Sequence, residues 1–122
     1  MHINYVKLKE FRDLKIRKSE ICDLDKIDIF NAIIDKGKPV IIHPYNIIKL
    51  LNEFRENKLS EEHLLEWVNT IMFTDLFRYN DKFRDSIASV ISELEEIDEE
   101  GKELTYDKIK KYIYALENNI EI

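Results

Sequence analysis

Two neighbouring runs of sequence decide the fold, Ile47-Ile-Lys-Leu-Leu-Asn-Glu-Phe54 and Leu64-Leu-Glu-Trp-Val-Asn-Thr-Ile-Met72. In each run the apolar residues recur three and four positions apart, which is the spacing of one face of an α-helix. Pro44 is favoured in the first turn of the first helix, because its missing N–H would have no partner there. Ser60 can cap the second helix through its hydroxyl. The pattern predicts two helices, over residues 44–56 and 61–72.

Three further segments outside this pair have helical periodicity. One begins at Asp25, which can cap it, and ends at Gly37, a residue suited to the left-handed conformation that closes a helix. Another begins at about Asp81, and the last is capped by Thr105. Their apolar faces are Ile27, Phe30, Ile33 and Ile34; Phe83, Ile87, Val90, Ile91 and Leu94; and Ile109, Tyr112, Ile113 and Leu116.

The first twenty residues fit two patterns. Residues 3–8 alternate like a strand with one slip, whereas Tyr5, Leu8 and Phe11 have helical spacing. We expect two short extended pieces there, or one strand and a turn. Further along, residues 40–42 are typical of a short extended crossing. Residues 73–79 are expected to form a connector or the last turns of the preceding helix.

The chain as a whole is predicted to be a single, mainly α domain. Only two Gly and two Pro occur among its 122 residues, too few for the many tight turns of an all-β fold. The apolar fraction of 44% is ordinary for a globular chain and argues against disorder. We expect a compact bundle of about five helices over residues 25–118. Residues 1–22 add at most a short strand or extended arm to the single domain, 1–122.

Composition also bears on the compartment. Cys22 is the only cysteine, so an internal disulfide is impossible, as is usual in a reducing interior. The N-terminus lacks the apolar core of a signal peptide. No apolar run approaches the ~20 residues needed to cross a bilayer. We therefore expect a cytoplasmic protein that does not enter a membrane.

Motifs for catalysis and metal binding are missing from the sequence. His2, His43 and His63 lack partners at the spacing of a helical metal site. Residues 23–34 lack the Gly and the Glu of a calcium loop, and the two glycines of the chain are too isolated for a phosphate loop. We expect no enzyme, no metal and no cofactor. An unrecognised enzyme stays open as an alternative, and it would need a concave site lined by His43 or Cys22.

The most unusual segment is acidic, Glu93-Leu-Glu-Glu-Ile-Asp-Glu-Glu-Gly-Lys-Glu103. Its seven carboxylates face one cation, Lys102, and they repel each other unless solvent or a cationic partner relieves them. A solubilising helix end explains the run without any partner. A docking surface explains it equally well, because crowded like charges gain most when a cation approaches. The residues expected to bind a basic protein are Glu95, Glu96, Asp98, Glu99, Glu100 and Glu103, with Phe77 and Tyr79 as aromatic anchors beside them.

The N-terminal segment has the opposite charge, since residues 1–22 carry six cations and three acids. A solvated face of mixed charge is the simpler interpretation of this segment. The alternative is a small regulatory or phage-encoded adaptor that contacts nucleic acid or another protein through it. The helix pair also has the order of a helix-turn-helix. However, Glu61 and Glu62 at the start of its second helix would point acids at the phosphates.

A resemblance adds to this interpretation. Residues 46–57 run through Leu59-Ser-Glu-Glu62 into the aromatic-bearing helix at Trp67, and a later helix, an acidic loop and a short final helix follow. Over residues 46–118 this order resembles the small helical bacterial immunity proteins of the colicin D-like kind. The resemblance implies a helical bundle whose acidic surface covers the active site of a toxin, and it assigns no individual contact residue. Together with the acidic run, it indicates a non-catalytic binding protein that neutralises a basic toxin, such as a nuclease.

Overall fold

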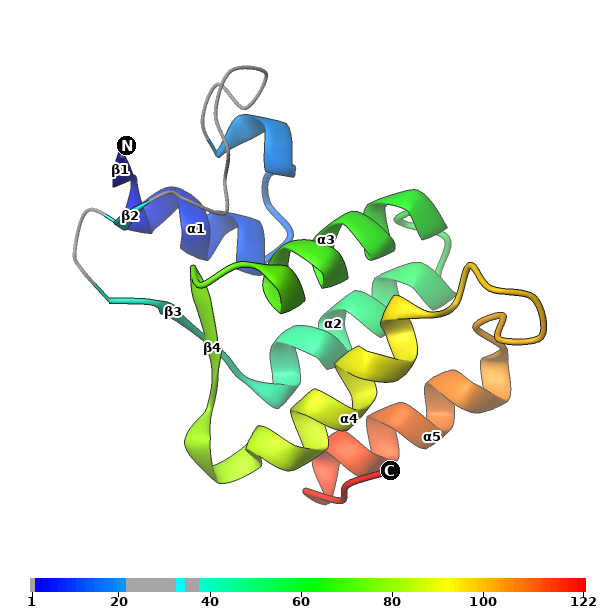
Figure 1. The fold of residues 1–122 in the computed structure, drawn as a ribbon. Helices are drawn as coiled ribbons and strands as arrows, with labels where there is room; N and C mark the ends of the chain where they lie inside the picture. Colours follow the sequence, from blue (N-terminus) through cyan, green and yellow to red (C-terminus); the bar gives the residue numbers. More distant parts are fainter. Residues whose placement is uncertain (1, 22–32, 35–37) are drawn as a thin grey trace.

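Long helices form the body of the molecule, and two short pairs of strands lie at one side of it (Figure 1). The structure, a computed structural model, describes residues 2–21, 33–34 and 38–122. The elements of these residues, in which η denotes a 3₁₀ turn, are β1 (His2–Ile3), α1 (Tyr5–Arg12), η1 (Lys18–Glu20), β2 (Ile33–Ile34), β3 (Val40–Ile42), α2 (Pro44–Arg55), α3 (Glu61–Phe73), β4 (Phe77–Tyr79), η4 (Asp81–Phe83), α4 (Arg84–Glu95) and α5 (Tyr106–Glu117). The prediction of a mainly α fold is confirmed, with five α-helices in the described part of the chain.

The core lies between α2, α3, α4 and α5. Helix α2 packs against α5, and α4 packs against both α3 and α5. Trp67 of α3 is the largest side chain with no exposed surface. Leu50 of α2 and Ile87 of α4 are also fully buried. The ring of Phe11 in α1 contacts that of Phe77 in β4, with 5.9 Å between the ring centroids. The apolar faces predicted for 44–56, 61–72 and the two C-terminal helices therefore meet in one core.

The predicted ends of these helices are confirmed by their hydrogen bonds. The hydroxyl of Ser60 accepts the N–H of His63 at 3.1 Å, and that of Thr105 accepts the N–H of Lys108 at 3.2 Å. Asn57 follows α2 with a φ of 61°, the left-handed conformation that Asn tolerates better than most residues. Asn57 thus marks the C-terminal end of α2, and the hydroxyls of Ser60 and Thr105 cap the starts of α3 and α5.

The N-terminal segment differs from the prediction, because α1 is a helix where extended pieces or a strand and a turn were expected. The Oδ1 atom of Asn4 accepts the N–H of Val6 at 2.8 Å and so caps the helix. Leu8 and Phe11 lie one turn apart and have no exposed surface. The helical spacing prevailed over the alternation because it buries both side chains on one face. Of the expected extended structure, β1 is present and pairs with β2 in parallel.

The extended crossing predicted at residues 40–42 is confirmed as β3. Its partner is β4, which lies in the segment predicted as a connector and runs parallel to it, with Val40 opposite Phe77 and Ile42 opposite Tyr79. Parallel strands need a long crossover, and α2 and α3 supply it. The pair places the end of β3, just before α2, beside the end of β4, just before η4 (Figure 1).

Ile33–Ile34 and Asp81–Phe83, both predicted as parts of α-helices, have other structures. The helix predicted from Asp25 lies outside the described residues except at Ile33–Ile34, which form β2 and not a helical turn. The helix predicted from about Asp81 begins as the 3₁₀ turn η4 and becomes regular at Arg84, the first residue of α4. The N–H of Lys82 donates a hydrogen bond to Asn80 Oδ1, at 3.0 Å, which supports that first turn.

Candidate functional site

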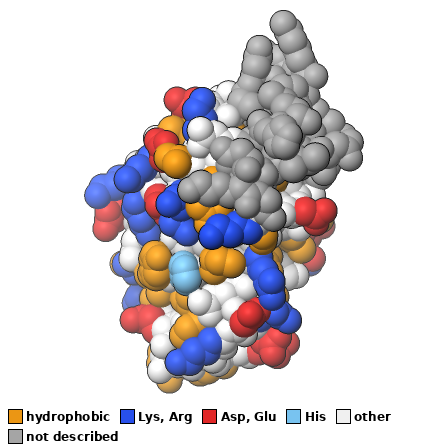
Figure 2. Space-filling model, turned by 90° about the vertical axis from the view of Figure 1, so that its left-hand side faces the viewer, with side chains coloured by type: hydrophobic (Ala, Val, Ile, Leu, Met, Phe, Trp, Pro, Cys, Tyr) orange, Lys and Arg blue, Asp and Glu red, His pale blue; other side chains and the backbone are white. Residues whose placement is uncertain are grey.

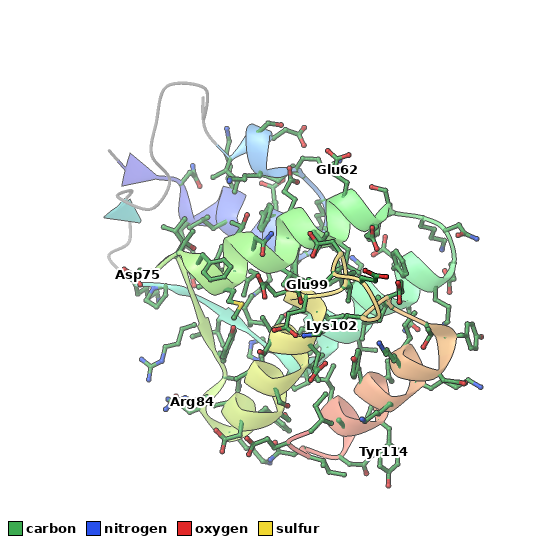
Figure 3. The ribbon with its side chains drawn as sticks, turned by 45° about the vertical axis from the view of Figure 1, so that its right-hand side comes forward. Glu62, Asp75, Arg84, Glu99, Lys102 and Tyr114 are labelled. Atoms are coloured by element: carbon green, nitrogen blue, oxygen red, sulfur yellow. The ribbon has the colours of Figure 1, made fainter. Side chains whose placement is uncertain are left out.

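The acidic turn, residues 96–105, joins α4 to α5 at one end of the bundle (Figures 1 and 3). Asp98, Glu99 and Glu100 are exposed, whereas the side chains of Glu95 and Glu96 are half-buried. Gly101 has a φ of 81°, a conformation that glycine adopts without strain, and it turns the chain back toward α5. The run predicted from the sequence therefore forms a turn that presents three consecutive carboxylates to solvent.

Lys102 neutralises part of this charge. Its ammonium lies 2.7 Å from a carboxylate oxygen of Glu96 and 3.4 Å from one of Glu99 (Figure 3). These hydrogen bonds raise the pKa of Lys102, so it stays charged. Among the described residues, no cation forms an ion pair with Asp98 or Glu100. The turn thus keeps a surplus of negative charge after its internal pairs are made.

Glu103 is held by the backbone of the same turn. Its Oε1 accepts the N–H of Gly101 at 3.3 Å, and the backbone carbonyl of Glu103 accepts the ammonium of Lys108 at 3.0 Å. Hydrogen bonds from the backbone N–H groups of Glu103 and Gly101 lower the pKa of this carboxyl group. Glu103 is therefore an exposed carboxylate with a fixed position.

The aromatic anchors predicted beside the acidic run lie elsewhere. Phe77 and Tyr79 belong to β4, before the first turn of α4, whereas the acidic turn follows its last residue. A helix of twelve residues is about 18 Å long, so the two groups occupy opposite ends of α4. Phe77 is 8% exposed and packs against Phe11, and Tyr79 is half-buried, so that burial raises its pKa. The expectation that both side chains flank the carboxylates is wrong.

Other acids extend the negative end of the bundle. Helix α4 runs back along α3, so the first turn of α3 lies at the same end as the acidic turn (Figure 1). Glu61 and Glu62 occupy that turn and are exposed (Glu62, Figure 3). Acids in the first turn favour the helix, because they lie at the positive end of its dipole. The sequence placed these acids at a helix start, and the structure places that start near the acidic turn.

The basic N-terminal segment is partly used inside the fold. The guanidinium of Arg12 donates to the carbonyl of Ile41 at 2.9 Å and pairs with Asp13 at 2.9 Å. Arg17 pairs with Glu66 of α3 at 2.7 Å, and this bond raises the pKa of Arg17. Two of the six cations counted in the segment therefore hold α1 and its following turn against the bundle.

His43 lies between β3 and α2 and lines two adjoining hollows, of about 340 and 500 Å³. Its ring stacks on Tyr45, with 5.1 Å between centroids and 7° between planes, and its Nδ1 lies 3.2 Å from Nδ2 of Asn80. No described carboxylate, hydroxyl or thiol bonds to the ring, so a catalytic pair is not formed within the described residues. Cys22, the other residue that an enzyme would have needed, lies outside them.

His43 and His63 resist protonation. Burial, and then the charge of Arg12, lower the pKa of His43 below its ordinary 6.5. Burial, and then Arg17, lower that of His63. His63 is half-buried in α3, and its Nε2 is buried without a hydrogen bond to any described residue.

These pKa shifts predict acid sensitivity at mildly acidic pH. A folded-state pKa below 6.5 means that the unfolded chain binds more protons between the folded value and 6.5. The stabilising effect of the neutral rings is complete above pH 6.5 and is lost as the pH falls below it. We expect the free energy of unfolding, measured with urea, to be smaller at pH 5.5 than at pH 7.5.

The matched variant is His43→Asn with His63→Asn, which removes both titrating rings. Its free energy of unfolding should change less between the two pH values than that of the parent. Asp81 and Glu103, whose carboxyl pKa values are lowered from already acidic ones, titrate below this window and do not obscure it. Equal stability of the parent protein at both pH values would contradict the assignment.

The described residues show neither a metal site nor a membrane-spanning helix. In the part of the chain that the structure describes, no three His, Cys, Asp or Glu side chains are grouped as a metal site would require. None of the described helices is long and apolar enough to cross a membrane. No family model matches the sequence, and no curated protein or solved structure shows detectable similarity to it. The likeness to immunity proteins therefore stays a hypothesis from the sequence.

Proposed function

We propose that this chain is a non-catalytic acidic binding protein that inhibits a basic toxin, such as a nuclease, and that the acidic turn is its docking surface. The observation that carries the proposal is the turn itself, in which Asp98, Glu99 and Glu100 are exposed and Lys102 alone supplies positive charge to the run. The place of action that fits such an inhibitor is the bacterial cytoplasm, where nucleic acids need protection.

The proposed mechanism is occlusion by charge mimicry. A nuclease binds the phosphates of its substrate in a cationic cleft, and a row of carboxylates on a projecting turn can occupy that cleft. The surplus charge of the turn, together with Glu61 and Glu62, attracts the cleft at long range and speeds association at low salt. Inhibition then needs no chemistry, because covering the cleft excludes the substrate.

The direct test neutralises the turn. We expect Glu96→Gln, Asp98→Asn, Glu99→Gln and Glu100→Gln together to leave the helical content unchanged, since the side chains contribute to no core contact. At about 0.2–1 kcal/mol for each exposed charge pair, the loss of four pairs should weaken binding by roughly 4- to 1,000-fold at low salt. The measurement is calorimetric titration, at low and high salt, against the purified product of a neighbouring toxin-sized gene.

A matched control separates position from net charge. Four exposed acids lie outside the turn, at Asp75, Asp85, Glu117 and Glu121. Replacing them by Asn or Gln changes the net charge by the same amount. This variant should bind like the parent. Lys102→Gln should bind more tightly, because it frees the carboxylates of Glu96 and Glu99. Unchanged affinity of the turn variant at low salt would mean that the run is only a solvated helix end.

The alternative function, an adaptor that contacts nucleic acid through residues 1–22, gains no observation in its favour. Arg12 and Arg17 form ion pairs within the chain and are not available as free cations. The start of α3 presents Glu61 and Glu62, which disfavours its docking into a DNA groove. We therefore advance the inhibitor alone.

A further inference from the structure

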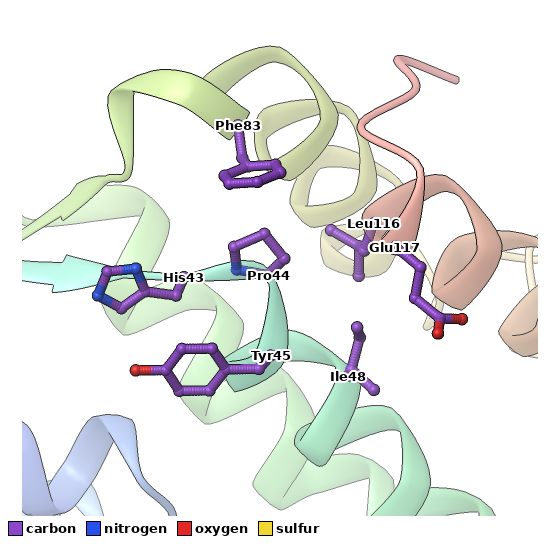
Figure 4. Close-up of a pocket in the computed structure, with 7 residues that line it drawn as sticks. All are labelled: His43, Pro44, Tyr45, Ile48, Phe83, Leu116 and Glu117. Carbon is purple, nitrogen blue, oxygen red and sulfur yellow. The ribbon is translucent and has the colours of Figure 1, made fainter.

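Two hollows adjoin each other at the face that carries β3 and β4, where hydrophobic side chains and Lys and Arg side chains gather around a histidine (Figure 2). The apolar hollow, about 340 Å³, is lined by Pro44, Tyr45, Ile48, Phe83 and Leu116, with Glu117 as its charged residue (Figure 4). The polar hollow, about 500 Å³, is lined by Ile41, Arg78, Tyr79, Asn80, Asp81 and Lys82. His43 belongs to both.

The apolar hollow is lined by aromatic and aliphatic side chains. In Figure 4, Phe83 lies above Pro44, Tyr45 and Ile48 lie below it, and Leu116 lies to one side. Tyr45 is 61% exposed, so its ring can be reached from solvent. Volumes from about 300 Å³ upward are those of sites for small organic ligands. An aromatic ring in this hollow would meet a mostly apolar lining.

The polar hollow carries a positive charge that the protein does not neutralise. Asp81 is shared between Arg78, at 3.2 Å, and Arg84, so these three side chains keep one net positive charge. Lys82 adds another, and no described carboxylate pairs with it. Its ammonium lies 5.4 Å from the centroid of the Phe83 ring, so the free cation adjoins a wall of the apolar hollow.

His43 supplies a neutral donor between the hollows. Asn80 Oδ1 accepts the N–H of Lys82, so the Nδ2 of Asn80 is the group that faces the ring, and it donates to Nδ1 of His43. The imidazole proton is therefore on Nε2. No hydrogen bond within the described residues uses that N–H, which leaves it available to an acceptor.

From these contacts we propose that the two hollows form one binding site for a small aromatic anion, an aryl phosphate or aryl carboxylate. The ring lies in the apolar hollow with Pro44, Tyr45 and Phe83, and the anionic group lies in the polar hollow toward Lys82, Arg78 and the Nε2–H of His43. Glu117 fixes this orientation, because it repels an anion from the apolar hollow. The site is at the opposite end of α4 from the acidic turn, so it does not depend on the proposed inhibitor function.

The test is a titration of the isotope-labelled full chain, followed through its backbone amide NMR signals. The probes are 1-naphthyl phosphate, 1-naphthoate, 1-naphthol and inorganic phosphate. We expect the aryl anions to shift the amides of His43, Asn80 and Lys82, with about tenfold or greater preference over 1-naphthol and over phosphate, since ring and anion each contribute. Binding of only one aryl anion would identify the anionic group that the polar hollow accepts.

Variants assign the two halves of the site. Lys82→Gln should weaken binding of 1-naphthyl phosphate about tenfold without changing that of 1-naphthol, and Tyr45→Ser should weaken both. Lys111→Gln, the same charge change at an exposed position of α5, should have no effect. Equal affinity for 1-naphthol and 1-naphthyl phosphate, or anion binding that survives Lys82→Gln undiminished, would overturn the proposal, as would amide shifts confined to other parts of the chain.

Discussion

Trp67→Ala is expected to lower the free energy of unfolding by about 3–5 kcal/mol, the range found when large core side chains are truncated. The indole has no exposed surface and lies at the centre of the four-helix core. Its Nε1–H donates to the carbonyls of Phe11 at 3.2 Å and Arg12 at 3.3 Å, at the end of α1. The substitution therefore opens a cavity and also releases α1 from α3.

Circular dichroism at 222 nm with urea is the measurement, because Trp67 is the only tryptophan and its fluorescence is lost with it. Trp67→Phe keeps most of the volume and should cost about 1–3 kcal/mol, the cost of leaving buried acceptors without a donor. Met72→Ala, at a 36% exposed position of the same helix, should stay within about 0.5 kcal/mol of the parent. A Trp67→Ala variant as stable as Met72→Ala would show that the indole is not part of the core.

The sequence predicted those helices whose ends are set locally. Ser60 and Thr105 cap α3 and α5 as expected, since a hydroxyl next to a periodic apolar run satisfies N–H groups that no other local group can reach. Asn57 ends α2 in a different way, through a left-handed backbone conformation that Asn tolerates better than most residues. For these helices, the terminal residues and the apolar periodicity indicate the same bounds, so the bounds can be predicted from a single sequence.

The N-terminal segment could not be assigned by the same reasoning, because both of its patterns are short. Tyr5, Leu8 and Phe11 are compatible with a helix, and the alternation over residues 3–8 is compatible with a strand. The choice depends on what the side chains meet, and Phe11 meets Phe77, 66 positions away in the sequence. Packing between such distant residues is invisible to local periodicity.

The pairing of β3 with β4 also depends on contacts between residues that are distant in the sequence. Three residues carry too little pattern to identify a strand, and residues 77–79 contain an exposed Arg78 between two aromatics. Residues 77–79 form a strand because α2 and α3, which lie between the two segments in the chain, bring them beside residues 40–42. This pairing brings Asn80 against His43, so the hollows around His43 could not be predicted from sequence spacing.

The acidic turn, unlike the strand pairing, could be predicted largely from the sequence. Charge density is a property of the sequence itself, so the run from Glu93 to Glu103 and its place at a helix end could be predicted without coordinates. The relation of Phe77 and Tyr79 to that run is a property of the fold. It was wrongly predicted because closeness in sequence was taken for closeness in space, although a straight helix separates its two ends.

Arg12→Met is the second substitution with a large expected effect, a loss of about 2 kcal/mol of unfolding free energy, the scale of a hydrogen bond to a charged group. Its side chain is 14% exposed and links α1 to β3 through the carbonyl of Ile41 at 2.9 Å. Two of its nitrogens also donate to the carboxylate of Asp13, at 2.9 and 3.3 Å. Methionine keeps much of the length but leaves both acceptors without their donor.

Lys15→Met is the control, because it removes the same charge from the same segment at an exposed position where no described residue forms an ion pair. It should change the unfolding free energy by no more than about 0.5 kcal/mol. The comparison, made by urea unfolding under one salt condition, separates a structural arginine from a solvated lysine. If both variants lost the same small amount, Arg12 would be a surface cation like its neighbours, and the basic segment would again be free to serve as a contact surface. A large loss for Arg12→Met alone assigns that charge to the attachment of α1 to β3.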